Sequence, residues 1–113
     1  MVKYIALIWT KWDSDADAGT MEMDKYEEFN RAAAEAGVLQ GGSALQPASA
    51  ATTVRLRDDE VLMTDGPFVE SKEQLSGYYI LECDHLDDAL GWVARIPGAR
   101  HGAVEVRPLL PGP

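Results

Sequence analysis

Two amphipathic helical segments, each preceded and followed by a strand-like segment, constrain the fold of this chain most strongly. Residues 3–9 form a nearly continuous apolar run, which is typical of an internal strand covered on both faces. After an acidic loop at 12–19, Thr20 is the predicted N-cap of the first helix and Gly37 its predicted stop. Helical spacing predicts the buried stripe of this helix: Tyr26, Phe29, Ala33 and Ala36.

The middle of the chain predicts a strand at 38–45 followed by a hairpin. The Gly41-Gly42 pair in that strand indicates a bulge or a close approach of two backbones. Residues 52–57 alternate between two faces, and 61–64 return as the second arm after a turn at 58–60.

The C-terminal part repeats the order of strand, helix and strand. Residues 77–83 are rich in aromatic and β-branched side chains and predict a strand. Asp84 is the predicted N-cap of the second helix, which ends at Pro97-Gly98. Residues 103–107 alternate and predict the last strand. The apolar stripe of the second helix consists of Leu86, Ala89, Leu90, Val93 and Ile96.

This order predicts an α+β fold of the ferredoxin-like, split βαβ kind with an inserted β-hairpin. A chain of 113 residues fits one domain, 1–113. Right-handed crossovers place both helices on one face of the sheet. The opposite face then carries apolar strand residues and no helix, so we expect a second copy of the chain to cover it.

Composition excludes several classes of function. The formal net charge of −9 argues against nucleic-acid binding, because neutralising phosphates requires clustered Lys and Arg. No apolar run approaches the roughly 20 residues that span a bilayer, and the N-terminus lacks the pattern of a signal peptide. Cys83 is the single cysteine, which suits a reducing cytoplasm. Nucleotide-phosphate motifs and a zinc pattern are absent, so we expect no cofactor and no metal.

Several motifs resemble those of the YCII-related family, in its DGPF branch. The resemblance covers nearly the whole chain apart from the acidic loop and the last residues. It rests on the stretch Thr64-Asp65-Gly66-Pro67-Phe68-Val69-Glu70-Ser71-Lys72-Glu73-Gln74-Leu75-Ser76-Gly77-Tyr78-Tyr79, on Gly41-Gly42, on Leu45-Gln46-Pro47, on Thr52-Thr53-Val54-Arg55 and on Gly102-Ala103-Val104-Glu105-Val106-Arg107-Pro108. It implies that two ferredoxin-like subunits pair as a dimeric α/β barrel, and it implies no agreed activity.

The Asp-Gly-Pro turn at 65–67 has two interpretations. As turn chemistry, the Asp65 carboxylate accepts from backbone N–H groups ahead of it, glycine permits unusual dihedrals and proline fixes the next φ. As catalytic chemistry, the turn aims Asp65 into a cleft as a general base or a hydrogen-bond acceptor. Ser71 and Gln74 have capping-box spacing, which predicts a short helical turn. Lys72 lies between acids and is either a substrate clamp or part of a solvated charge run.

A second constellation is spread across strands. By alternation Glu105 and Arg107 share one face of the last strand, and Arg55 and Arg57 share one face of the hairpin. On the helix-free face these arginines would bind an anionic ligand through bidentate forks, or they form a cross-strand ladder of salt bridges. Tyr78 and Tyr79 point to opposite faces, so one of them faces the same cleft.

His101 is the second catalytic candidate, because histidine titrates near neutral pH. The alternative for it is an ordinary surface residue, and His85 is interpreted only in that way. The resemblance implies that other branches of the YCII superfamily use a His–Asp pair for acid–base chemistry. This chain has no histidine before position 85, so an earlier histidine cannot be carried over.

Two functions remain open from the sequence. The first is a dimeric enzyme that handles a compact anionic or carbonyl-bearing metabolite in a polar dimer cleft, with Asp65 and His101 in acid–base roles. Its predicted substrate-binding residues are Lys72, Tyr78, Arg55, Glu105 and Arg107. The second is a ligand-sensing or accessory module, which the resemblance associates with extracytoplasmic-function sigma factors. Neither alternative involves nucleic acid or a membrane.

Overall fold

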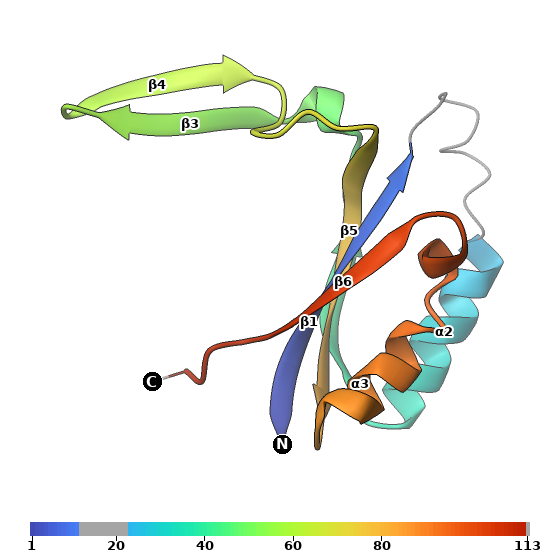
Figure 1. Cartoon of the computed structure of the whole chain (residues 1–113). Coiled ribbons are helices and arrows are strands. Elements are labelled where there is room, and N and C mark those ends of the chain that lie inside the picture. Colours follow the sequence, from blue (N-terminus) through green and yellow to red (C-terminus); the bar gives the residue numbers. More distant parts are fainter. Residues whose placement is uncertain (12–22, 113) are drawn as a thin grey trace.

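The computed structural model describes residues 1–11 and 23–112, which form a four-stranded antiparallel sheet covered by helices on one side (Figure 1). The strands lie in the order β2-β5-β1-β6, so the apolar N-terminal strand is internal, as predicted. The acidic loop and the N-cap Thr20 lie outside the described residues. The strand bounds are β1 Val2–Lys11, β2 Leu39–Ala44, β5 Glu73–Cys83 and β6 Ala103–Pro108.

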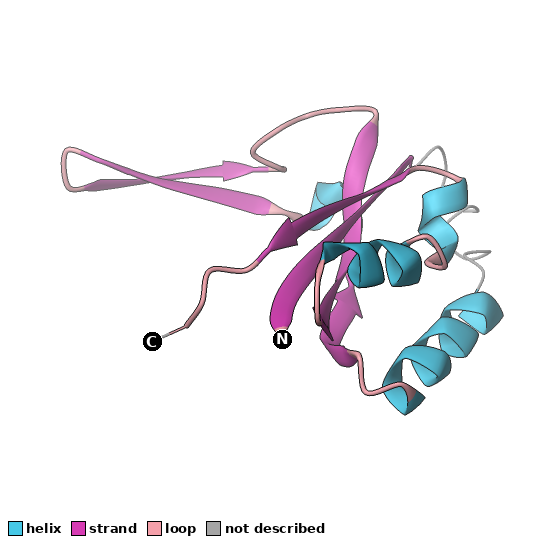
Figure 2. Cartoon of the chain, turned by 60° about the horizontal axis from the view of Figure 1, so that its bottom comes forward, coloured by secondary structure: helices cyan, strands magenta, loops and turns pink. Residues whose placement is uncertain are grey.

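Helices α2 (Met23–Glu35) and α3 (Leu86–Val93) lie side by side on the same face of this sheet (Figures 1 and 2). Gly37 has a φ of 75°, the left-handed conformation predicted to stop α2. The predicted ferredoxin-like α+β fold is confirmed. The core between sheet and helices consists of Tyr4, Ala6, Ile8, Phe29, Ala33, Tyr79, Leu81, Cys83, Ala89, Val93 and Ile96.

The ends of the second helix differ from the prediction. His85, not Asp84, is the N-cap residue, and it makes no side-chain capping bond. Asp87 and Asp88 in the first turn nonetheless place negative charge near the positive end of the helix dipole. The helix ends at Val93, and Pro97 instead begins a 3-10 turn, η2 (Pro97–Arg100).

The hairpin of β3 (Thr52–Arg57) and β4 (Glu60–Asp65) projects from the side of the sheet opposite the helices (Figures 1 and 2). Asp58 and Asp59 form its tip with φ values of 51° and 64°, as a tight two-residue turn requires. Eleven of its twelve strand residues are exposed. The radius of gyration is consequently 15.9 Å, against about 13 Å for a compact chain near this length.

Pairing register defines a helix-free face on the sheet. Ile5 pairs with Ile80 and Arg107, and Leu7 pairs with Tyr78 and Glu105. Paired residues project to the same side, opposite to the buried Tyr4, Ala6 and Ile8. We use the name helix-free face for the following set: Ile5, Leu7, Trp9, Leu75, Tyr78, Ile80, Glu105 and Arg107.

Glycines allow two close approaches of backbone within this fold. The register of β2 shifts between Leu39 and Gly41, which confirms the predicted bulge. A Cβ at Gly42 would lie 2.6 Å from the carbonyl oxygen of Tyr78, so β2 can approach β5 only with glycine at this position.

Gly102→Ala is expected to lower the free energy of unfolding by about 3 kcal/mol, because overpacking forces a backbone shift. A Cβ at Gly102 would lie 2.0 Å from the carbonyl oxygen of Trp9, and backbone cannot move away cheaply. Gly91→Ala is the matched control, since a Cβ at this exposed position in α3 meets no atom within 4 Å. Urea denaturation of both variants measures the difference. Equal stability of the two would contradict the packing described at Gly102.

Candidate functional site

A pocket of about 540 Å³ lies where the base of the hairpin meets the sheet. Its walls come from residues 45–48, 50 and 51, from residues 67–69 of the DGPF stretch, and from Trp9, Glu73, Gln74 and Leu75 of the sheet. We call it the hairpin-base pocket. Most of its lining side chains are apolar, which favours an uncharged ligand body.

Hydrogen bonds hold the walls of the hairpin-base pocket in place. The side-chain oxygen of Gln74 accepts from the backbone N–H of Ala48 at 3.0 Å, which ties η1 (Ala48–Ala50) to β5. The N–H of Gly66 donates to the carbonyl of Ala51 at 2.7 Å, and Thr53 Oγ1 donates to the carbonyl of Gly66 at 2.8 Å. Gly66 has a φ of 103°, so the predicted use of glycine for unusual dihedrals is confirmed.

Two lining residues carry buried polar atoms that lack a hydrogen-bond partner in the described part of the chain. They are the indole donor Nε1 of Trp9 and the carboxylate acceptor Oε2 of Glu73. Their strand positions are neighbours, because Trp9 pairs with Leu75 and Lys11 pairs with Glu73. An unsatisfied buried polar group costs about 1–3 kcal/mol, so both atoms favour a ligand that supplies an acceptor and a donor.

Asp65 ends β4, is exposed and does not line the hairpin-base pocket. Its carboxylate makes no hydrogen bond to residues 66–112 or to the rest of the described chain, so the predicted turn role of this side chain is wrong. Backbone bonds of Gly66 hold the turn instead. The predicted helical turn after Ser71 is also wrong, because Ser71 Oγ donates to the carbonyl of Glu73, where β5 begins.

Two of the predicted substrate-binding residues flank this pocket without lining it. The guanidinium of Arg55 lies 4.7 Å from the ring centroid of Phe68, so it stacks on the outer wall. Lys72 is exposed in the connection between β4 and β5. Arg55 therefore stabilises the position of Phe68, a wall residue.

Glu105 and Arg107 are brought together on the helix-free face. Arg107 Nε donates to Glu105 Oε2 at 2.6 Å, and the pair is well exposed. Tyr78 shares a cross-strand row with Leu7 and Glu105. An exposed ion pair of this kind contributes about 0–1 kcal/mol to stability. The pair therefore adds little to the stability of the fold, and it places two charged groups on the helix-free face.

His101 follows η2 and is exposed, on an element distant in sequence from Asp65. No interaction in the described chain joins the two catalytic candidates, because Asp65 makes none. His85 lies 3.5 Å from the carboxylate of Asp88 on the same helix. Among residues 1–11 and 23–112, no group of His, Cys, Asp and Glu side chains is placed to hold a metal ion, and no helix could span a membrane.

Cys83 and Tyr79 are buried on the helix side of the sheet. Burial, with smaller effects from Asp88 and Asp84, raises the pKa of the Cys83 thiol, which disfavours the nucleophilic thiolate. Burial, with a smaller effect from Tyr26, raises the pKa of Tyr79 to about 12, and its hydroxyl donates to Asn30 Oδ1. Both residues are therefore part of the core.

The model of the YCII-related domain matches residues 3–112. The chain belongs to the YCII-related family. An uncharacterised protein of Rhizobium meliloti (strain 1021) is 36% identical over 104 residues, which cover 90% of this chain and 82% of that protein. The family match thus spans the sheet, both helices and the hairpin.

Sequence reasoning did not predict that Trp9 and Glu73 of this YCII-related domain lie together in one site. The sequence places Glu73 in a charged run and Trp9 at the end of an apolar strand. Their proximity depends on the β1–β5 register, which shifts by one residue between Ile8 and Trp9. Finding this site from the sequence would have required information that positions 9 and 73 are close in space.

Proposed function

We propose that the protein is a homodimer that binds a small neutral molecule in the hairpin-base pocket. The two unpartnered buried atoms, Trp9 Nε1 and Glu73 Oε2, carry the proposal for the ligand. A carbonyl oxygen would accept from the indole, and an amide or hydroxyl group would donate to the carboxylate. An anionic group would be repelled by Glu73, so within the predicted classes the carbonyl-bearing ligand is favoured over the anionic one.

The proposed dimer uses the helix-free face and the hairpin together. The hairpin displays an apolar face because Val54 pairs with Met63 and Leu56 pairs with Val61. Val54 is 60% exposed and Met63 is 71% exposed. The hairpin projects on the side of the helix-free face, which includes Ile5 and Leu7 (Figure 1). In a two-fold symmetric dimer, the helix-free face and the apolar face of the hairpin in each subunit would be covered by the partner subunit.

The ligand site is tested with benzamide, which carries an aromatic body, a carbonyl acceptor and an amide donor. We expect benzamide to shift the indole N–H signal of Trp9 in nuclear magnetic resonance spectra, and benzoate to shift it far less. Glu73→Gln is expected to weaken benzamide binding by about tenfold or more, because it removes a charged acceptor. Trp9→Phe is expected to weaken it by removing the donor.

Glu70→Gln is the matched control, because Glu70 is exposed in the same segment and does not line the pocket. It should leave the affinity for benzamide unchanged. If benzamide and its neutral aromatic analogues leave the Trp9 signal unmoved, or if both glutamate variants bind equally well, the ligand proposal is wrong.

Catalysis at this site is a second candidate, favoured by one observation. The Asp65 carboxylate is exposed and directly precedes Gly66 and Pro67, of which Pro67 lines the pocket. We propose that the chain is of the DGPF branch and that Asp65 would act as its acid–base group. Asp65→Asn should then abolish turnover of a bound compound while leaving the affinity for that compound unchanged.

The alternative function, a sensing or accessory module, is distinguished by ligand binding without turnover. A sigma factor or another protein that co-purifies with the chain would also favour it.

A further inference from the structure

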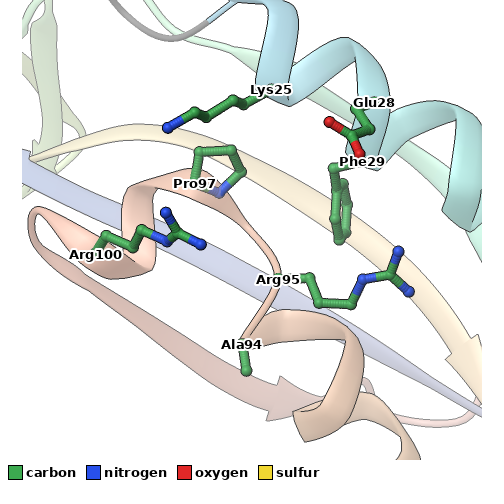
Figure 3. Close-up of a pocket in the computed structure, with 7 residues that line it drawn as sticks. All are labelled: Lys25, Glu28, Phe29, Ala94, Arg95, Pro97 and Arg100. Atoms are coloured by element: carbon green, nitrogen blue, oxygen red, sulfur yellow. The ribbon is translucent and has the colours of Figure 1, made fainter.

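A second pocket, of about 340 Å³, lies on the helix side of the sheet between α2 and the segment that follows α3. Lys25 and Glu28 line it from α2, while Arg95 and Arg100 line it from the segment that follows α3 (Figure 3). Phe29 and Pro97 form apolar parts of its lining. We call it the interhelix pocket. It shares no residue with the hairpin-base pocket.

The charge in this pocket is opposite to that of the chain. Among its described lining residues, Arg95 and Arg100 contribute two positive charges and Lys25 a third, against one acidic residue, Glu28, whereas the chain carries −9. Neither Arg95 nor Arg100 forms an ion pair with a carboxylate among the described residues. Like charges repel one another, so ion pairing among the described residues does not explain why the two arginines share one pocket.

Both arginines are positioned by packing that leaves their N–H donors available. The guanidinium of Arg95 lies 4.5 Å from the ring centroid of Trp92, and Trp92 packs edge-on against Phe29 with 6.3 Å between centroids. Stacking uses the flat face of the guanidinium, while its donors point outward in its plane. Phe29 is only 3% exposed, so the Arg95 stack rests on the core.

Arg100 is positioned by η2, which packs closely on the sheet and on α2. Pro97 and Gly98 of this turn are buried. A Cβ at Gly98 would lie 2.7 Å from Ile8 Cγ2 and 2.8 Å from the hydroxyl of Tyr26, so the turn has little room to move. Arg95 and Arg100 thus project from chain segments that are already packed (Figure 3).

We propose that the interhelix pocket binds the phosphate group of a small phosphorylated metabolite. Arginine forks match the oxygens of phosphate bidentately. The Glu28 carboxylate is an acceptor for a hydroxyl group of the same ligand. This site is separate from the neutral-ligand site of the proposed function, so either proposal can fail without the other.

The test titrates the full-length protein with glycerol 3-phosphate, with inorganic phosphate and with glycerol, at constant ionic strength. We expect calorimetry to show saturable binding of glycerol 3-phosphate at millimolar concentrations or below, and no binding of glycerol. Equal affinity for inorganic phosphate would identify free phosphate as the ligand, which also supports the proposed chemistry. Backbone signals of residues 94–100 should shift on binding. If neither phosphate compound binds, the proposal is wrong.

Arg95→Gln and Arg100→Gln are each expected to weaken binding by about tenfold or more. Arg57→Gln is the matched control, because it removes the same charge from the exposed hairpin, away from the pocket. Both pocket arginines are exposed, so thermal melting should show that all three variants are folded. If Arg57→Gln weakened phosphate binding equally, the phosphate would respond only to the net charge of the protein, and the proposed site would be wrong.

Discussion

Leu7→Asp is expected to leave the subunit folded and to dissociate the proposed homodimer. Leu7 lies in the central strand of the helix-free face, between Tyr78 and Glu105 in the register. A carboxylate there would be buried in the dimer beside the carboxylate of Glu105, and the neighbouring cation, Arg107, is already paired with Glu105. Burying an unpaired charge costs several kcal/mol, so we expect the dimer affinity to fall by about a thousandfold or more.

Analytical ultracentrifugation over a range of protein concentrations measures this change. Leu86→Asp is the matched control, because Leu86 is 47% exposed at the start of α3, on the helix side of the sheet. The same apolar-to-acid change should leave the dimer intact there. If Leu7→Asp remains as dimeric as the control, the helix-free face is not the interface.

Leu81→Ala is expected to lower the free energy of unfolding by about 2–5 kcal/mol, the range for deleting buried methyl groups and leaving a cavity. Leu81 is 0% exposed and is among the largest fully buried side chains of the core. Its strand is bonded on both sides, to β1 and to β2, so the backbone cannot easily collapse into the space.

Urea denaturation at a fixed protein concentration measures this loss, because dimerisation makes apparent stability depend on concentration. Leu86→Ala provides the comparison, since it removes the same atoms from a half-exposed position and should change stability by less than about 1 kcal/mol. A loss at Leu81 no larger than that at Leu86 would mean that the core is not packed as described.

The fold was predictable where sequence periodicity reports burial directly. The apolar run at 3–9 became the internal strand β1, and the alternation at 52–57 became one arm of the hairpin. Helical spacing identified Phe29 and Ala33 as buried. These signals are local, and the tertiary structure agrees with them.

Short local motifs were less predictive, because tertiary contacts outweigh them. Ser71 and Gln74 have capping-box spacing, yet Glu73 and Gln74 form the start of strand β5 because they pair with β1. The side-chain oxygen of Gln74 then accepts a hydrogen bond from the backbone N–H of Ala48 and does not cap a helix. Asp84 is a better capping residue than His85 by type, but the chain reaches the helical conformation one residue later.

The candidate sites were the least predictable part, because both join residues far apart in the sequence. Trp9 and Glu73 become neighbours only through a shifted strand register. Lys25 and Arg95 face one pocket from elements separated by 95 − 25 = 70 positions. The arginines were predicted either to bind an anion on the helix-free face or to form salt bridges there, and Arg107 forms an ion pair with Glu105. The proposed phosphate site lies on the helix side of the sheet.

The mass of the protein in solution tests the central claim, pairing through the helix-free face, most directly. Light scattering coupled to size-exclusion chromatography at micromolar concentration should give about twice the chain mass of 12.3 kDa. A particle of 12.3 kDa under the same conditions would mean that the helix-free face and the hairpin stay uncovered, and it would contradict the account.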